Sequence, residues 1–221
     1  MRTRIEHLVE GGWFALLDPW LPRAEADALF EALRAGVAWR QDKIKLFGSE
    51  FLQPRLSAWY GDPGAIYTYS GLTLSPDPWS PPLAELKARV ESACAELPVA
   101  EPPRASRAPR PAFNSVLLNY YRGGDDSMGF HADAEKELGQ NPLIASVSLG
   151  APRRFVIKPA RKWKDAPAVE LELGGGSLLV MGGTTQHHHR HGVPKQRGAG
   201  PRINLTFRRI LGQGPRAGAG A

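Results

Sequence analysis

Two histidines and one aspartate in this chain have the types and the spacing to hold a metal ion. His131 and Asp133 lie two positions apart, and His191 follows much later in the chain. Side chains two positions apart on an extended segment point to the same side, so both could reach one ion. Two imidazoles and one carboxylate can occupy one face of an octahedral metal and leave three positions open, as in non-heme Fe(II) oxygenases. The alternative is a loop histidine beside a solvated aspartate.

The third ligand of this candidate site has competitors. The segment 186–191 also contains His187, His188 and His189, of which His189 is the strongest alternative to His191. The histidines that do not bind the ion would lie beside the site or on the surface, where they could bind metals nonspecifically. Spacing alone leaves this choice open.

A second group of polar residues could hold an anion. On a strand over 202–208, alternation places Arg202, Asn204, Thr206 and Arg208 on one face, and the apolar residues between them would pack into the core. Two arginines and an amide on an inward face are costly unless they bind something. A guanidinium suits a carboxylate because it donates two parallel hydrogen bonds. The alternative is a solvated strand face with ion pairs to acidic side chains.

Asn119 and Tyr121 extend this polar group. They also share one face by alternation and lie just upstream of His131, so an amide and a phenol could complete a pocket for a small dicarboxylate. Simple core packing is the alternative for the tyrosine. A 2-oxo acid can fill two open positions of the metal and oxygen the third, while an arginine holds the far carboxylate. The two groups together predict an Fe(II)/2-oxoglutarate oxygenase.

Helical patterns followed by strand-like patterns indicate the elements that must position both groups. Apolar residues at helical spacing predict helices over 23–39 and 82–97. Short apolar runs separated by Gly, Pro and Asn follow, which is typical of an antiparallel sandwich or jelly roll. The expected strands cover residues 116–121, 143–149, 155–158, 169–173, 177–181 and 203–209.

Composition fits one globular domain with a basic surface. The 221 residues are 42% hydrophobic and 23% charged, and the single cysteine, Cys94, rules out an internal disulfide. The net charge of +6 favours a polyanion such as nucleic acid, and an arginine-rich surface without a partner is the alternative. We find no apolar stretch long enough to span a membrane and no signal-like N-terminus, so we expect a cytoplasmic protein without a membrane partner. The segment 98–111 reads as a loop and 212–221 as a disordered tail.

Three blocks of the chain resemble the AlkB family of DNA-repair dioxygenases. These blocks are 119–135, 142–155 and 176–209, and the stretch RINLTFR at 202–208 is similar to the family's signature. The resemblance extends to 60–62 and 67–76 and covers about residues 35–210, judged by these motifs. Within the family, the stretch from 60 to 76 is similar to the subgroup that prefers double-stranded DNA.

The resemblance implies a fold and a set of cofactor ligands. The fold would be mainly β with flanking helices, a double-stranded β-helix with an N-terminal nucleotide-recognition lid. One domain would cover 1–211, with helices and lid in 1–97 and the catalytic jelly roll in 112–211. His131, Asp133 and His191 would bind Fe(II), which selects His191 from its neighbours. The residues implied to bind 2-oxoglutarate are Asn119, Tyr121, Arg202, Asn204 and Arg208, with Arg202 on the far carboxylate.

The resemblance also implies an activity and a way of reading the substrate. The enzyme would oxidatively demethylate 1-methyladenine and 3-methylcytosine in DNA and release formaldehyde, succinate and CO2. The base must be flipped out of the duplex, and Phe47 would fill the gap. The residues implied to contact DNA or the damaged base are Phe47, Arg55, Tyr67, Tyr69, Ser70 and Glu135, with Lys43, Lys45, Arg161, Lys162 and Lys164 as possible phosphate contacts.

One departure and several alternatives accompany this assignment. Ala134 stands where the subgroup has a second aspartate, which leaves the choice of base open. The same catalytic core could serve an oxygenase acting on RNA, on protein or on a small molecule. A nucleic-acid-binding module with a degenerate metal site is the non-enzymatic alternative. We expect a monomer.

Overall fold

The structure is a computed structural model that describes residues 1–46, 49–69, 72–98 and 112–211. The predicted finger Phe47, Ser70 of the predicted lid, nearly all of the 98–111 loop and the 212–221 tail lie outside the described residues. For Lys45, Tyr67 and Tyr69 the structure describes the backbone alone. No helix in the described ranges combines the length and the apolar character that a membrane crossing needs.

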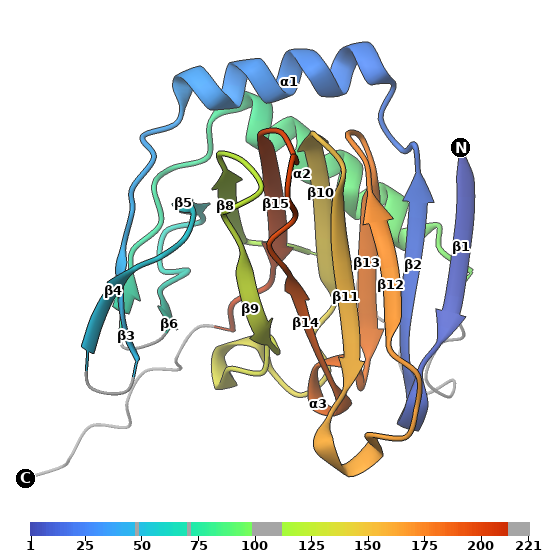
Figure 1. The fold of residues 1–221 in the computed structure, drawn as a ribbon. Coiled ribbons are helices and arrows are strands. Elements are labelled where there is room, and N and C mark those ends of the chain that lie inside the picture. The colour runs from blue at the N-terminus through green and yellow to red at the C-terminus, as the bar shows by residue number, and fades with distance from the viewer. Residues whose placement is uncertain (47–48, 70–71, 99–111, 212–221) are drawn as a thin grey trace, which may run out of the picture.

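Two antiparallel sheets stacked face to face form the body of the protein (Figure 1). The larger sheet has seven strands, in the order β1 (Arg2–His7), β2 (Gly12–Asp18), β13 (Leu178–Gly183), β10 (Ile144–Gly150), β15 (Arg202–Arg208), β8 (Ser115–Tyr121) and β5 (Leu56–Gly61). The smaller sheet has four strands, in the order β12 (Val169–Leu173), β11 (Arg153–Pro159), β14 (His189–Val193) and β9 (Met128–His131). This architecture confirms the predicted jelly roll with flanking helices.

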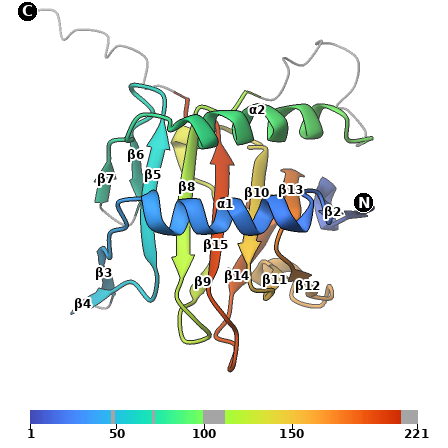
Figure 2. The same ribbon diagram turned by 90° about the horizontal axis from the view of Figure 1, so that it is seen from above.

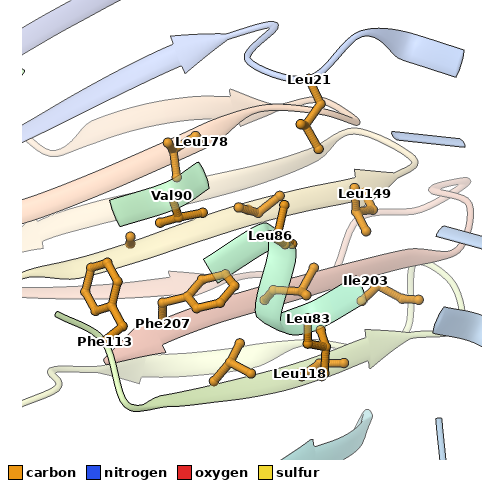
Figure 3. Packing of buried hydrophobic residues seen from close by; sticks show 14 of the residues in the cluster. Leu21, Leu83, Leu86, Val90, Phe113, Leu118, Leu149, Leu178, Ile203 and Phe207 are labelled. Atoms are coloured by element: carbon orange, nitrogen blue, oxygen red, sulfur yellow. The ribbon is translucent and has the colours of Figure 1, made fainter. Parts of the chain in front are cut away.

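Two helices cover the outer face of the seven-stranded sheet (Figure 2). Helix α1 (Arg23–Gly36) starts after Pro22, and helix α2 (Pro81–Ala95) carries proline in its first turn, where a missing N–H costs nothing. Both lie within the predicted ranges to within a few residues. Figure 3 shows Leu83, Leu86 and Val90 of α2 packed onto this sheet.

Strict alternation along the central strands divides the interior into two layers. In β15, Ile203, Leu205 and Phe207 belong to the apolar cluster beneath the helices, where Figure 3 shows Ile203 and Phe207. Arg202 and its alternate neighbours therefore face the smaller sheet. A second apolar cluster, which includes Phe14 and Phe155, fills the space between the two sheets. The sandwich interior is therefore partly apolar and partly polar, and the polar part lies along β15 and β8.

The N-terminal third of the chain does more than the sequence predicted. Strands β1, β2 and β5 belong to the seven-stranded sheet, so part of the segment 1–97 shares a sheet with strands of the segment 112–211. Strand β2 reads as a continuous apolar run because both of its faces are buried, which hides the two-residue period. Two hairpins form separately: β3 (Lys43–Leu46) with β4 (Ser49–Leu52), and β6 (Tyr67–Tyr69) with β7 (Leu72–Leu74).

Candidate metal and cofactor site

The three predicted metal ligands meet inside the sandwich. His131 at the end of β9 lies directly opposite His191 of β14, and their ring centroids are 4.4 Å apart. His131 Nε2 lies 3.9 Å from Asp133 Oδ1. One ligand atom from each of the three residues lies within 4.8 Å of the others. This donor set fits a divalent iron ion bound on one face.

Local backbone features hold these ligands in place. The carbonyl oxygen of Gly129 lies 2.9 Å from Nδ1 of His131, so this nitrogen can donate its proton there and leave Nε2 free for a metal. The backbone N–H of Asp133 donates to Gln186 Oε1 at 3.0 Å. A Cβ on Gly192 would lie 3.0 Å from the carbonyl oxygen of Met128, so glycine lets β9 and β14 approach closely.

The electrostatic setting keeps Asp133 and His191 in the forms that bind metal. Arg208 Nη2 lies 2.8 and 2.9 Å from the two carboxylate oxygens of Asp133. Burial alone would raise the pKa of Asp133, but Arg208, His191 and His131 outweigh it and lower the pKa to about 2. Burial is the main cause that lowers the pKa of His191 to about 3, with His131 adding to it. A charged carboxylate and neutral imidazoles are the forms that coordinate a cation.

The other histidines of the crowded run point to different partners. His187 Nε2 contacts the carbonyl oxygen of Gln140 at 2.9 Å, and the ring of His188 packs edge-on against Trp163. His189 is buried on the same face of β14 as His191. Among the described residues, the one cluster with metal-binding geometry is that of His131, Asp133 and His191. This geometry supports His191 as the third ligand.

Four of the five predicted anion-binding residues, Asn119, Tyr121, Asn204 and Arg208, border a cavity beside the three metal ligands, and Arg202 contacts two of them, Tyr121 and Asn204. Strands β8 and β15 pair so that Asn119 lies opposite Asn204 and Tyr121 opposite Arg202. The cavity, including its mouth, holds about 430 Å³ of empty space. Its wall contains Asn119, Tyr121, Met128, His131, Ser146, Phe155, Met181, His191, Gly192, Val193, Asn204, Thr206 and Arg208. The structure therefore brings the two groups of polar residues together at one site.

Arg202 is the clearest sign that this site takes an anion. Its side chain is 1% exposed, and Nη2 donates to Ser148 Oγ at 2.9 Å and to Asn204 Oδ1 at 2.8 Å. Nε and Nη1 are buried without a hydrogen-bond partner among the described residues. Burial lowers the pKa of Arg202 to about 10, and the neighbouring Tyr121 opposes this shift. A buried guanidinium with unused donors fits the carboxylate of a small dicarboxylic acid such as 2-oxoglutarate.

Of the six residues predicted to contact DNA or the damaged base, the structure describes the side chains of two, Arg55 and Glu135. Arg55 was expected on the DNA-contacting surface, but it is 5% exposed and its Nε donates to Asn119 Oδ1 at 2.8 Å. Arg55 therefore contacts a residue of the cavity wall, and its expected contact with DNA stays a prediction. Glu135 is half-buried, and its Oε2 has no hydrogen-bond partner among the described residues.

Sequence reasoning missed several polar residues around the cavity. Ser146 donates to Asn204 Oδ1 at 2.8 Å, and Ser148 accepts from Arg202. Alternation along 144–150 already places both serines on one face, which was the available signal. Gln186 and Arg153 carried no such signal, because their partners come from loops distant in the sequence.

Comparisons with known proteins agree with this geometry. Residues 14–208 match the 2OG-Fe(II) oxygenase superfamily. The DNA oxidative demethylase ALKBH2 of Bos taurus is 39% identical over 201 residues, which cover 86% of this chain and 66% of the bovine protein. The human ALKBH2 is 38% identical, with 86% of this chain and 70% of the human protein covered.

Two further relatives widen the comparison. The human alpha-ketoglutarate-dependent dioxygenase alkB homolog 3 is 39% identical over 84% of this chain and 62% of its own length. The solved structure of OsALKBH1 superimposes with a TM-score of 0.63, covering 93% of this chain and all of the other, at 16% identity, which supports the fold alone. The chain spans about two thirds of the length of its curated relatives. With its iron-binding triad inside a jelly roll, the chain belongs to the AlkB family of the 2OG-Fe(II) oxygenase superfamily and is a dioxygenase that uses Fe(II) and 2-oxoglutarate.

Proposed function

We propose that this dioxygenase repairs DNA by oxidative demethylation of N-alkylated bases, with 1-methyladenine and 3-methylcytosine as substrates. The observation that carries the proposal is the position of the triad: His131 and His191, which cluster with Asp133, line one cavity together with the polar faces of β8 and β15. The similarity to ALKBH2, a DNA oxidative demethylase, over 86% of the chain supports the choice of substrate.

We assign the two ends of 2-oxoglutarate to different residues of the cavity. Arg202 has unused buried donors and takes the far carboxylate, with Tyr121 and Asn204 beside it. Arg208 and Asn119 border the cavity nearer the other end, where Arg208 already contacts the metal-binding Asp133. When bound, Fe(II) and 2-oxoglutarate together supply the power to hydroxylate an N-methyl group with O2. The protein residues fix the cofactor's orientation and exclude water from the reacting atoms.

Recognition of the base requires that it leave the DNA stack. Flipping costs about a few kcal/mol, and a side chain that fills the gap offsets part of this cost. We assign this filling role to Phe47 and the stacking of the flipped base to Tyr67 and Tyr69, with Ser70 in the same lid. Glu135 follows the metal-binding segment by two positions, and its buried Oε2 is available to a donor on the base edge.

The surface charge supports a nucleic-acid partner. The net charge is +6, and the side chains of Lys43, Arg161, Lys162 and Lys164 are exposed. Such cations bind phosphates without reading sequence. We further propose that the protein acts as a monomer in the cytoplasm, on single- or double-stranded alkylated DNA.

The proposal is tested with an oligonucleotide that carries one 1-methyladenine. The oligonucleotide is given to the protein as a single strand and as a duplex. With Fe(II), 2-oxoglutarate and O2, mass spectrometry should show loss of the methyl group, with formaldehyde and succinate formed in equal amounts. Intact iron binding without any repair of either substrate would contradict a DNA substrate. Phe47→Ala should reduce repair of the duplex more than repair of the single strand, and equal loss on both would argue against its gap-filling role.

A further inference from the structure

Two buried arginines lie beside one tyrosine of the cavity wall. The guanidinium carbon of Arg202 is 5.3 Å from the ring centroid of Tyr121, and that of Arg153 is 5.5 Å from the same centroid. Arg153 is 0% exposed and Arg202 is 1% exposed. Both acidic side chains that are buried in the described residues pair with other arginines: Asp126 with Arg122, and Asp133 with Arg208. Asp126 also interacts electrostatically with Arg153, so this one carboxylate faces two arginines. Within the described residues, no buried carboxylate pairs with Arg202.

Backbone carbonyl groups hold Arg153 in its place. Its Nη1 donates to the carbonyl oxygen of Gly123 at 3.1 Å, and its Nη2 donates to those of Asp126 and Pro194 at 2.8 and 2.9 Å. These carbonyls come from the loop between β8 and β9 and from the segment after β14. The hydrogen bonds fix the guanidinium group, but neutral carbonyl oxygens do not cancel its charge.

The two arginines affect each other as like charges. Burial lowers the pKa of Arg153 below its usual value. Burial is also the main cause of the lowered pKa of Arg202, and the charge of Arg153 adds to it. A pair of buried like charges disfavours both charged forms unless an anion binds between or beside them. The pair therefore makes this part of the sandwich unusually favourable for a negatively charged group.

We propose that Arg153 is a positioning and specificity-determining residue of the cofactor pocket. It fixes the ring of Tyr121 and supplies a second buried positive charge, so the pocket selects a 2-oxo acid with two carboxylates over one with a single carboxylate. This inference rests on the proposed assignment of Arg202 and Tyr121 to the far carboxylate of 2-oxoglutarate. A charge about 6–10 Å away, at an effective dielectric constant of about 20, corresponds to roughly tenfold to a hundredfold in affinity.

Binding of two acids to the full-length, Fe(II)-loaded protein without oxygen tests this role by calorimetry. The probes are 2-oxoglutarate and 2-oxopentanoate, which has the same carbon chain but lacks the far carboxylate. Arg153→Met removes the charge, and Arg153→Lys keeps it while losing the forked donors. Arg154→Met is the matched control, because Arg154 is the next residue on β11 and its exposed side chain lies near Glu170.

The ratio of the two affinities gives the result. In Arg153→Met, binding of 2-oxoglutarate should weaken by roughly tenfold or more, while binding of 2-oxopentanoate changes less than about threefold. Arg153→Lys should keep the wild-type ratio within about threefold, and Arg154→Met should match the wild type.

Several outcomes would overturn the inference. An equal loss for both acids in Arg153→Met would mean that the residue acts through general packing. Thermal unfolding identifies a variant that does not fold. If Arg153→Met does not fold, Arg153→Lys becomes the deciding variant. Loss of the wild-type ratio of the two affinities in Arg153→Lys would then contradict a role for the charge. Failure of the wild-type protein to bind 2-oxoglutarate would instead refute the proposed cofactor pocket. No DNA is present, so the proposed substrate does not affect the result.

Discussion

At the scale of single residues, the surroundings of Asp133 keep its carboxylate charged and able to bind a metal ion. It is 2% exposed and charged, with a pKa of about 2, because Arg208 and the two histidines outweigh the cost of burial. Asp133→Asn keeps the shape of the side chain but removes the charge that a divalent cation needs. We expect the affinity for iron to fall by at least about a hundredfold, because changes in residues that merely support a metal ligand already cost up to about that much. Succinate formation should stop.

DNA affinity separates this loss from a general defect. Because Asp133 is buried, the affinity of Asp133→Asn for methylated DNA should stay within about twofold of the wild-type affinity, the usual range for a change that removes no contact. The control is Asp125→Asn, which changes an exposed carboxylate eight positions earlier and should leave iron binding unchanged. Full activity of Asp133→Asn would mean that the ligand is misassigned.

At the scale of elements, the carboxylate of Asp126 stabilises the loop between β8 and β9 by hydrogen bonds within the loop. Asp126 accepts hydrogen bonds from the backbone N–H, Nε and Nη2 of Arg122 at 2.8, 2.8 and 2.9 Å. The hydrogen bond from the Arg122 side chain is the main cause that lowers the pKa of Asp126 below its usual 3.8. The same loop supplies the carbonyls that hold Arg153 and leads into β9 with its metal ligand. Asp126→Asn should lower the free energy of unfolding by about 1–3 kcal/mol at pH 7.

The pH dependence of this effect has a definite sign. A carboxyl group whose pKa is lower in the folded chain than in the unfolded chain stabilises the fold above the unfolded value, and this stabilisation is lost as the pH falls through the folded value. The difference between wild type and Asp126→Asn should therefore shrink below about pH 3.8, the usual value of this group. Urea unfolding of both proteins at pH 7 and pH 3 measures this difference in the free energy of unfolding. A difference that stays constant with pH would contradict the role of the charged form.

The hairpin of β3 and β4 is connected to the cofactor cavity through Arg55. Gln53 follows this hairpin and hydrogen-bonds with its backbone N–H to the carbonyl oxygen of Asp42, and Arg55 then donates to Asn119 Oδ1. This hydrogen bond engages the amide oxygen of Asn119 and leaves its N–H donors for other partners. Arg55→Gln should raise KM for 2-oxoglutarate by about tenfold, the cost of a charge-assisted hydrogen bond, with a smaller change in kcat.

Two controls define the role of Arg55. Arg55→Lys keeps a donor and should recover part of the loss. Arg40→Gln removes an exposed arginine from the segment before the hairpin and should leave KM for 2-oxoglutarate unchanged. An Arg55→Gln protein with wild-type KM but weaker DNA binding would contradict this role in the cavity and support the expected contact with DNA.

Strands in which polar and apolar residues alternate could be predicted from the sequence, and strands that are apolar on both faces could not. The strand 202–208 alternates strictly, so its two faces and the polar site along one of them were predictable. Strand β2 has apolar residues on both faces and therefore lacks a period. The position of Arg55 depends on a strand pairing between β5 and β8 that is distant in the sequence, so local pattern alone could not place it.

At the scale of the whole molecule, the two sides of the sandwich have different tasks. Helices α1 and α2 close the outer face of the seven-stranded sheet, as Figure 2 shows, while the smaller sheet carries two of the metal ligands. Trp163 packs on His188, the residue before β14, and this contact holds the basic segment with Lys162 and Lys164 near the smaller sheet. Substrate contacts are therefore expected on that side and not on the helical side.

Salt dependence of DNA binding tests this asymmetry. Each phosphate that a cation neutralises contributes about 0.9 to the slope of log affinity against log salt concentration on duplex DNA. The double variant Lys162→Gln/Lys164→Gln should weaken binding and reduce the slope by up to about 1.8 in fluorescence anisotropy titrations. The matched control is Arg23→Gln/Arg34→Gln, which removes the same charge from α1. An equal change in both double variants would show that overall charge, and not the side of the smaller sheet, attracts DNA.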